Sequence, residues 1–383
     1  MSYELSAIIS IGLEKYVVNE FNLKKDQYFK DLPIKAKVFK GGVGFYFDDP
    51  FCFHLIQVLR SPTKFFLKIA EFKCRDLPKL FNKLTKVPWE NYIYSKSIKV
   101  TSTASKSRLI NTKKIEETAS KALEKWLSAN PRKKLPLTDF TKDQIIHLSL
   151  IEDLLTLRIN CSGEPNFKRN LRHTQGIAPL RENYAYILLS ILTNNLKDLN
   201  NKTELIDPMC GSGTFLSEAL NFFGFIKGRD FSYQYFYALK GLKPLVENSS
   251  HLKKIYFCGV EKNKYLESFH QKNFLNSPEI KFIYNDFFLL KRSNFSSEKQ
   301  ILICNLPYGK RIKVNEDINS FYEKFIKHVF NEFKDCSAGV LLPTIFAKKL
   351  KLKQLASFKN GGLNVSFCQV NPGFNTNATG VRD

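Results

Sequence analysis

The sequence Asp207-Pro208-Met209-Cys210-Gly211-Ser212-Gly213-Thr214 links an apolar strand expected over 204–207 to a helix expected over 214–223. Small residues let a backbone approach a ligand closely, and a helix that begins near Thr214 would aim unpaired N–H groups at an anionic group. Ligands of open α/β sheets bind beyond the carboxyl ends of the strands. We therefore expect a ligand at this loop, held by Asp207, Met209, Cys210, Gly211, Ser212, Gly213 and Thr214.

Strands and helices alternate from about residue 178 onward. The pattern predicts helices over 182–196, 214–223 and 266–275, and strands over 204–207, 255–261, 281–285 and 301–304. Such alternation predicts a mostly parallel, doubly wound sheet, which is a Rossmann-like α/β fold.

A carboxylate follows the second strand of this expected sheet. Glu261 ends the strand 255–261, where an acidic side chain can accept both hydroxyls of a ribose. The spacing from the glycine-rich loop to Glu261 is long, so we expect the Phe- and Tyr-rich segment 225–243 to be looped out. A nicotinamide dinucleotide is the competing ligand, but its site usually has a third glycine where this chain has Leu216.

Asn285 and Asp286 end the third expected strand. Asp286 is placed to hydrogen-bond an adenine amino group, with Phe287 available to cover the ring. A turn that merely terminates the strand is the alternative.

Asn305-Leu306-Pro307-Tyr308 follows the apolar strand 301–304. An exocyclic amine of a base is a poor nucleophile because its lone pair is delocalised into the ring, so acceptors must localise that lone pair. The Asn305 side-chain oxygen and the Leu306 carbonyl can accept the two amine protons, Pro307 fixes the backbone, and Tyr308 can stack on a flipped base. Alone, the tetrapeptide also fits an ordinary β-turn. Together with the glycine-rich loop it indicates methyl transfer to nucleic acid.

The N-terminal part predicts a mixture of helix and strand. Helices are expected over 10–21, 52–60, 76–84 and 109–126, and strands over 36–40, 44–47, 65–70, 144–150 and 154–160. We divide the chain into an N-terminal α+β segment over 1–50, an α+β domain over 51–162, a basic linker over 163–177 and the doubly wound domain over 178–383.

The net charge of +23 points to a polyanionic partner. Residues 1–50 are neutral, residues 51–175 carry +13 and the remainder carries +10, which favours a dedicated binding module over a uniformly basic surface. The segment 101–108 could present N–H groups and cations to phosphates at a helix N-terminus, although a solvated capping loop is an equal alternative. The candidate RNA-binding residues are Lys106, Arg108, Lys113, Lys114, Lys168, Arg169 and Arg172.

The eight cysteines are scattered without a CxxC pair, and several lie in apolar runs, as buried free thiols do. This distribution predicts a protein of the reducing cytoplasm, and the dispersed histidines predict no metal site. The N-terminus has no basic signal region, and no apolar run approaches the roughly 20 residues of a membrane span.

These motifs resemble the THUMP-domain RNA methyltransferases, specifically the RlmL/YpsC-like group that modifies guanine N2 in large-subunit ribosomal RNA. The 207–214 loop resembles that family's S-adenosyl-L-methionine loop, and 305–309 resembles its catalytic motif. The segment 178–183 resembles the part that packs beside the methionine end, which adds Pro179 and Glu182 to the cofactor-binding candidates. Residues 167–169 resemble its basic linker. Weaker collinear matches at 12–14, 41–43 and 87–90 resemble its ferredoxin-like and THUMP segments, whose implied role is to grip RNA.

The resemblance implies a seven-stranded methyltransferase domain that transfers a methyl group to a guanosine N2, with 23S ribosomal RNA as the expected substrate. The family commonly has proline where this chain has Leu306, and Leu-Pro also occurs in related tRNA guanine methyltransferases. A tRNA methyltransferase, a DNA adenine or cytosine methyltransferase and a non-catalytic RNA-binding assembly factor therefore remain open. Because the chain stops at Asp383, we expect a single methyltransferase domain and one activity.

Overall fold

The computed structural model describes residues 2–95, 97–130, 143–169, 180–194, 202–246, 256–308 and 317–371. The chain forms two compact units. Unit 1 comprises Met1–Ile9, Val17–Asn166 and Arg229–Val246, and unit 2 comprises Ser10–Tyr16, Phe167–Gly228 and Glu247–Asp383.

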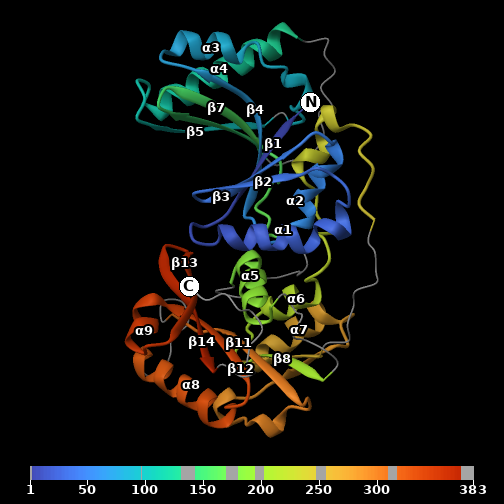
Figure 1. Cartoon of the computed structure of the whole chain (residues 1–383), viewed down its shortest axis with the longest axis vertical. Helices are drawn as coiled ribbons and strands as arrows, with labels where there is room; N and C mark the ends of the chain where they lie inside the picture. The colour runs from blue at the N-terminus through green and yellow to red at the C-terminus, as the bar shows by residue number, and fades with distance from the viewer. Residues whose placement is uncertain are drawn as a thin grey trace. The chain divides into compact units, whose positions relative to one another are not determined.

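Unit 1 is built on a seven-stranded sheet in the order β2-β3-β1-β4-β7-β6-β5 (Figure 1). Neighbouring strands are antiparallel except β5 and β6, which are parallel. The strands are β1 Tyr3–Ile8, β2 Lys35–Phe39, β3 Gly42–Phe47, β4 Lys64–Lys73, β5 Ile98–Ser105, β6 Gln144–Ile151 and β7 Leu154–Asn160.

Helices cover one face of this sheet. The helices are α1 Glu14–Tyr28, α2 Leu55–Val58, α3 Leu77–Leu84 and α4 Thr112–Ala129. Phe21 of α1 contacts Phe45 of β3, with ring centroids 5.1 Å apart. Leu123 of α4 and Leu157 of β7 border a void of only about 10 Å³, so little space remains under α3 and α4.

Unit 2 contains the second seven-stranded sheet, in the order β10-β9-β8-β11-β12-β14-β13. The first five strands of this order are parallel, and β14 runs antiparallel between β12 and β13. The strands are β8 Thr203–Asp207, β9 Tyr256–Val260, β10 Ile280–Ile283, β11 Lys299–Asn305, β12 Ser337–Pro343, β13 Lys353–Asn360 and β14 Leu363–Asn371. The expected doubly wound sheet is confirmed.

Helices lie on both faces of the second sheet, as its apolar strands require. The helices are α5 Glu182–Leu192, α6 Thr214–Leu220, α7 Glu267–Phe274, α8 Ile318–Glu332 and α9 Thr344–Lys349. Phe325 of α8 and Ala347 of α9 share one buried cluster with Val340 of β12. On the other face, α5 packs against α6.

Three of the differences from the expected pattern bear on the candidate RNA-binding segment or on the division into domains. Residues 101–105 belong to strand β5 rather than to a capping loop, and α4 begins only at Thr112, where the Asn111 side chain accepts from Lys114 N–H. No division between compact units falls at residue 50, because β4 pairs directly with β1 in one sheet. The segment Arg229–Val246 does leave the doubly wound unit, but it packs as part of unit 1.

Candidate active site

Four polar side chains stand at the carboxyl ends of four adjacent strands in unit 2. Asp207 ends β8 and Asn305 ends β11, while Glu261 and Asp286 follow β9 and β10. These strands are parallel neighbours in the order β10-β9-β8-β11, so their ends lie along one edge of the sheet. The fold therefore brings together groups that the sequence separates by up to about a hundred residues.

The glycine-rich loop is fastened to the end of β9. Cys210 N–H donates to the Val260 carbonyl at 2.9 Å, and Gly211 N–H donates to Glu261 Oε2 at 2.9 Å. Glu261 Oε1 also accepts from Asn263 N–H at 2.8 Å. The Glu261 carboxylate is thus fixed in orientation, yet each oxygen keeps a further lone pair for a ligand.

The loop needs glycine at residue 213. Gly213 precedes α6 with φ +72°, in the left-handed region, and a Cβ there would stand 2.8 Å from the Phe274 ring. Any side chain would therefore be strained, and the Phe274 ring would have to move to make room for it.

Asp207 is buried at the floor of the site. Burial, with a smaller contribution from the negative charge of Glu261, raises the Asp207 pKa to about 8, against the hydrogen bond from Met209 N–H. A cation placed between these two carboxyl groups would favour ionisation of Asp207.

His270 of α7, which was not among the candidates from sequence, hydrogen-bonds the backbone of the glycine-rich loop. Its Nε2 lies 2.7 Å from the Gly211 carbonyl, which can only accept, so Nε2 carries the proton and Nδ1 accepts from the Tyr284 hydroxyl at 3.0 Å. The ring also stacks on Phe282 at 4.1 Å. Burial lowers the His270 pKa, which keeps the imidazole neutral. The only sequence signal was its spacing of four residues from Phe274 on one helix face.

Asp286 pairs with Lys262, with Nζ 2.7 Å from Oδ2. Burial alone would raise the Asp286 pKa, but the hydrogen bonds from Lys262 and Phe288 N–H together lower it. The expectation for Phe287 was wrong, because this ring is buried in the core against Phe325 and cannot cover a ligand. Its neighbour Phe288 is only partly buried.

Asn305 and Tyr308 contact each other. The Tyr308 hydroxyl donates to Asn305 Oδ1 at 2.8 Å. Leu306 is buried and its N–H donates to the Leu341 carbonyl, while the Pro307 carbonyl accepts from the Tyr322 hydroxyl at 2.7 Å. Tyr322 of α8, also unidentified from sequence, thus anchors the tetrapeptide and occupies one of its carbonyls.

The remaining cofactor candidates surround the loop. Met209 is half-buried, and Cys210, Ser212 and Thr214 are buried. Glu182 is buried in the first turn of α5. Pro179 lies outside the described residues.

The RNA-binding candidates are dispersed. Lys106 and Arg108 follow β5, and Lys106 lies 3.8 Å from Glu152 in an exposed ion pair. Lys113 and Lys114 are exposed in the first turn of α4, and Lys168 is exposed.

Arg169 must be removed from these candidates. Its side chain is 1% exposed and forms an ion pair with the fully buried Glu218 at 3.3 Å. Arg169 is therefore buried within unit 2 and does not face RNA. Arg172 lies outside the described residues.

Within the described ranges, no group of three or more His, Cys, Asp or Glu could hold a metal ion. None of the helices described there is long and apolar enough to span a bilayer. All eight cysteines are buried free thiols, as expected.

Known proteins resemble this chain in both units. The family described as "RMKL-like, methyltransferase domain" matches residues 169–364. The ribosomal RNA large subunit methyltransferase K/L of Vibrio cholerae (strain O395) is 29% identical over 356 residues, which cover 87% of this chain and 48% of that protein. The chain spans about half the length of the curated relatives of this name.

Two solved structures share the fold along nearly the whole chain. SMU.472, solved in complex with SAH, has a TM-score of 0.73 at 23% identity and covers 97% of this chain and 98% of its own. TrmN from Thermus thermophilus has a TM-score of 0.65 at 16% identity and covers 96% and 99%. The architecture of both units is therefore shared with known proteins.

Proposed function

The chain belongs to the family of RMKL-like methyltransferase domains, and from that premise we propose that it methylates the exocyclic N2 of a guanosine in 23S ribosomal RNA, using S-adenosyl-L-methionine. The observation that carries this proposal is the row formed by Asp207, Glu261, Asp286 and Asn305 at adjacent strand ends. The name of the Vibrio cholerae relative supports ribosomal RNA as the substrate.

The chemistry of the donor set fits this cofactor. Asp207 and Glu261 place two carboxyl groups beside the glycine-rich loop, whose small residues let its backbone come close to a ligand. The carboxyl groups suit a ligand that carries a positive charge, and Glu261 can also accept hydrogen bonds from ribose hydroxyls. The Asp286 carboxylate can accept a hydrogen bond from an adenine amino group. When bound, S-adenosyl-L-methionine supplies a methyl group activated by its positively charged sulfur.

Asn305 supplies the acceptor side of the reaction. Its Oδ1 has two lone pairs, of which the Tyr308 hydroxyl uses one, so the second can accept a proton of the substrate amine. Because Tyr322 occupies the Pro307 carbonyl, the Leu306 carbonyl is the better candidate for the other amine proton. Holding both protons directs the nitrogen lone pair toward the methyl group, and positioning then lowers the barrier.

Tyr308 has to change partners if it is to stack on the base. Burial raises its pKa, so the hydroxyl stays protonated and keeps donating to Asn305 at neutral pH. In this arrangement Tyr308 polarises the Asn305 amide and restrains its rotation. Stacking would require the ring to turn out of this contact.

The test uses labelled cofactor with 23S ribosomal RNA, tRNA and DNA offered separately, followed by mass spectrometry of the nucleosides. We expect label on guanosine N2 from ribosomal RNA. Label on tRNA alone, on adenine or on DNA would overturn the substrate assignment, and failure to bind the cofactor in calorimetry would overturn methyl transfer itself.

Asn305→Ala tests the acceptor role. We expect the transfer rate to fall by at least about a hundredfold, because the variant lacks the side-chain oxygen that accepts one of the two amine protons. Cofactor affinity should be unchanged, and Asn305→Asp, which keeps an acceptor oxygen, should retain part of the activity. Full activity of Asn305→Ala would exclude the proposed role.

A further inference from the structure

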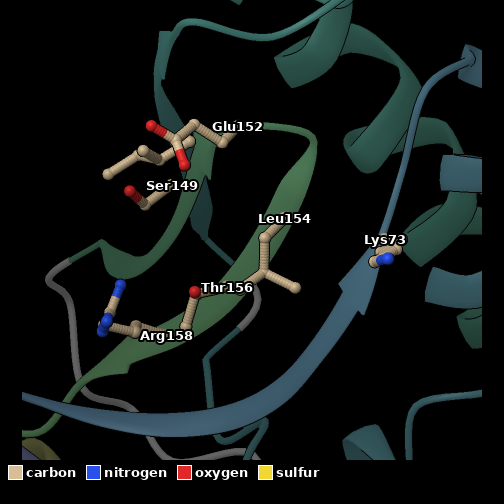
Figure 2. A pocket seen from close by; sticks show the side chains of 7 residues that line it. Lys73, Ser149, Glu152, Leu154, Thr156 and Arg158 are labelled. Atoms are coloured by element: carbon tan, nitrogen blue, oxygen red, sulfur yellow. The ribbon is translucent and has the colours of Figure 1, made fainter.

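Unit 1 carries a hollow of about 440 Å³ beside β6 and β7. Figure 2 shows Arg158 and Thr156 of β7 on one side of the hollow and Glu152 on the other. Two exposed apolar side chains, Ile151 and Leu154, also line it. This mixed lining selects no single class of ligand, whereas the acceptor side of the site in unit 2 holds polar groups in a defined arrangement.

The hairpin of β13 and β14 extends beyond the sheet edge that carries Asn305. Asn305 of β11 lies opposite Leu341 of β12, which lies opposite Phe367 of the antiparallel strand β14. β14 begins at Leu363, four residues closer to this edge than Phe367. The turn between β13 and β14 therefore stands past the end of β11, on the side where the substrate amine is expected.

A two-residue turn closes this hairpin. Asn360 pairs with Leu363, and Gly361 and Gly362 between them have φ +56° and +86°. A hairpin turn with positive φ at both central residues favours glycine there, so the two glycines account for the turn. The turn makes no demand on the side chain of Asn360, the last residue of β13.

The Asn360 side chain contacts the 305–308 tetrapeptide. It hydrogen-bonds the Tyr308 hydroxyl, which in turn donates to Asn305 Oδ1 at 2.8 Å. Because the hydroxyl proton is committed to Asn305, the amide nitrogen of Asn360 is the donor to Tyr308. Two hydrogen bonds in series keep this nitrogen within about 6 Å of Asn305 Oδ1.

The end of β13 is also fixed to α5. The Tyr184 ring packs on Phe358 with centroids 4.7 Å apart, and the Tyr184 hydroxyl lies 3.5 Å from the Lys359 carbonyl. Asn360 follows these two residues directly, so its position beside Asn305 does not depend on Tyr308 alone.

Rotation of the Tyr308 ring onto a flipped base would leave the two amides side by side. Asn305 then holds the amine that is to be methylated, and the Asn360 amide offers one acceptor oxygen and an NH2 donor to the neighbouring atoms of the base. In guanine these atoms are N1–H, a donor, and then O6, an acceptor. In adenine and cytosine the ring nitrogen beside the amine is an acceptor, so only guanine offers the amide both a donor and an acceptor.

We propose that Asn360 selects guanine by pairing with its Watson–Crick edge. The Asn360 side-chain oxygen accepts from N1–H and the amide nitrogen donates to O6, while Asn305 and the Leu306 carbonyl hold the N2 amine. This inference rests on the proposed function for the identity of the base, and it adds the residue that rejects other amine-bearing bases. Such a site rejects a base without the matching atoms because the amide is then left unpaired beneath it.

The experiment compares kcat/KM for guanosine and for 2-aminopurine riboside at the position of a 23S ribosomal RNA fragment that the wild type methylates. 2-Aminopurine keeps the amine at carbon 2, but its N1 is an acceptor and it lacks O6. We expect Asn360→Ala to reduce the preference for guanosine by about ten- to a hundredfold. The intrinsic reactivity of the analogue is the same for every variant, so the change in this ratio reports the contact.

Two further variants of the hairpin control for folding and position. Asn360→Leu keeps a side chain of similar size without hydrogen-bonding groups, and it should lose the preference as Asn360→Ala does. Asn364→Ala is the matched control, because Asn364 is exposed on β14 of the same hairpin, and it should keep the wild-type ratio. Thermal melting and cofactor affinity should match the wild type in all three variants.

Tyr308→Phe separates contact with the base from support of Tyr308. This variant removes the hydroxyl that bridges the two asparagines and keeps a ring that can stack. If Asn360 contacts the base, Tyr308→Phe retains the preference for guanosine. Equal loss of the preference in Tyr308→Phe and Asn360→Ala would overturn the inference, because Asn360 would then act only by holding Tyr308.

The outcomes also distinguish this inference from the proposed function. If the wild type methylates guanosine N2 but Asn360→Ala keeps the wild-type preference, the inference is overturned and the proposed function stands. Methylation of adenine by the wild type would overturn both.

Discussion

The carboxyl group of Asp207 is buried at the end of β8 beside the carboxylate of Glu261. Because its pKa is raised to about 8, the folded protein binds more protons than the unfolded chain between pH 3.8 and pH 8. The stability that this group contributes is fully present below its unfolded pKa and is lost as pH rises through the folded value.

We therefore expect Asp207→Asn to become more stable relative to wild type as pH rises. Between about pH 6 and pH 8 the difference in free energy of unfolding should change by on the order of 2 kcal/mol, measured by urea denaturation at several pH values. The amide oxygen of the substituted side chain still accepts from Met209 N–H, so the comparison isolates the titration. Parallel pH profiles for the two proteins would contradict the raised pKa.

Other residues show where sequence inference reached its limit. The positions of Asp207, Glu261, Asp286 and Asn305 at strand ends followed from apolar runs alone, since a parallel strand ends where its ligand-binding loop begins. The burial of Phe287 did not follow, because adjacent aromatic residues in a turn give no signal of which ring enters the core.

The element that most depends on one residue is the junction of the glycine-rich loop with α6. Gly213→Ala combines a positive φ with a contact of 2.8 Å to Phe274. Gly228→Ala is the matched control, since Gly228 has φ +69° but nothing within 4 Å of an added Cβ.

We expect both variants to lose about 1–2 kcal/mol of stability from backbone strain, and Gly213→Ala to lose more. Denaturant unfolding measures this difference, and calorimetry should show weakened cofactor binding for Gly213→Ala only. Equal destabilisation of the two variants would mean that the Phe274 ring moves aside for the new methyl group at no cost in stability.

The helices and strands of unit 2 up to β11 were predicted from periodicity, with ends displaced by a few residues. Strand β5 was missed because its hydroxyl-rich sequence, Ile98–Ser105, resembles a solvated loop when read alone. Its parallel pairing with β6 satisfies the backbone, which a local pattern cannot indicate.

At the scale of the whole molecule, each unit has its own sheet and its own core. Since the candidate cofactor site lies within unit 2, we expect S-adenosyl-L-homocysteine to raise the melting temperature of one of two calorimetric transitions. At about a hundred times its Kd the ligand should stabilise that transition by about 2.7 kcal/mol. A single transition would show that the units unfold together, and equal shifts of two transitions would contradict a ligand site confined to unit 2.

The amino-acid sequence by itself determined the doubly wound fold of unit 2, the place of its glycine-rich loop and the tetrapeptide 305–308. Each of these is encoded by neighbouring residues through apolar periodicity, small side chains and strand ends. Tertiary structure alone decided that β1 and β4 share one sheet, that 229–246 joins unit 1, that His270 supports the loop, and that Arg169 is buried against Glu218. These outcomes depend on which distant segments pack together, because pairing register and burial are set by contacts across the fold.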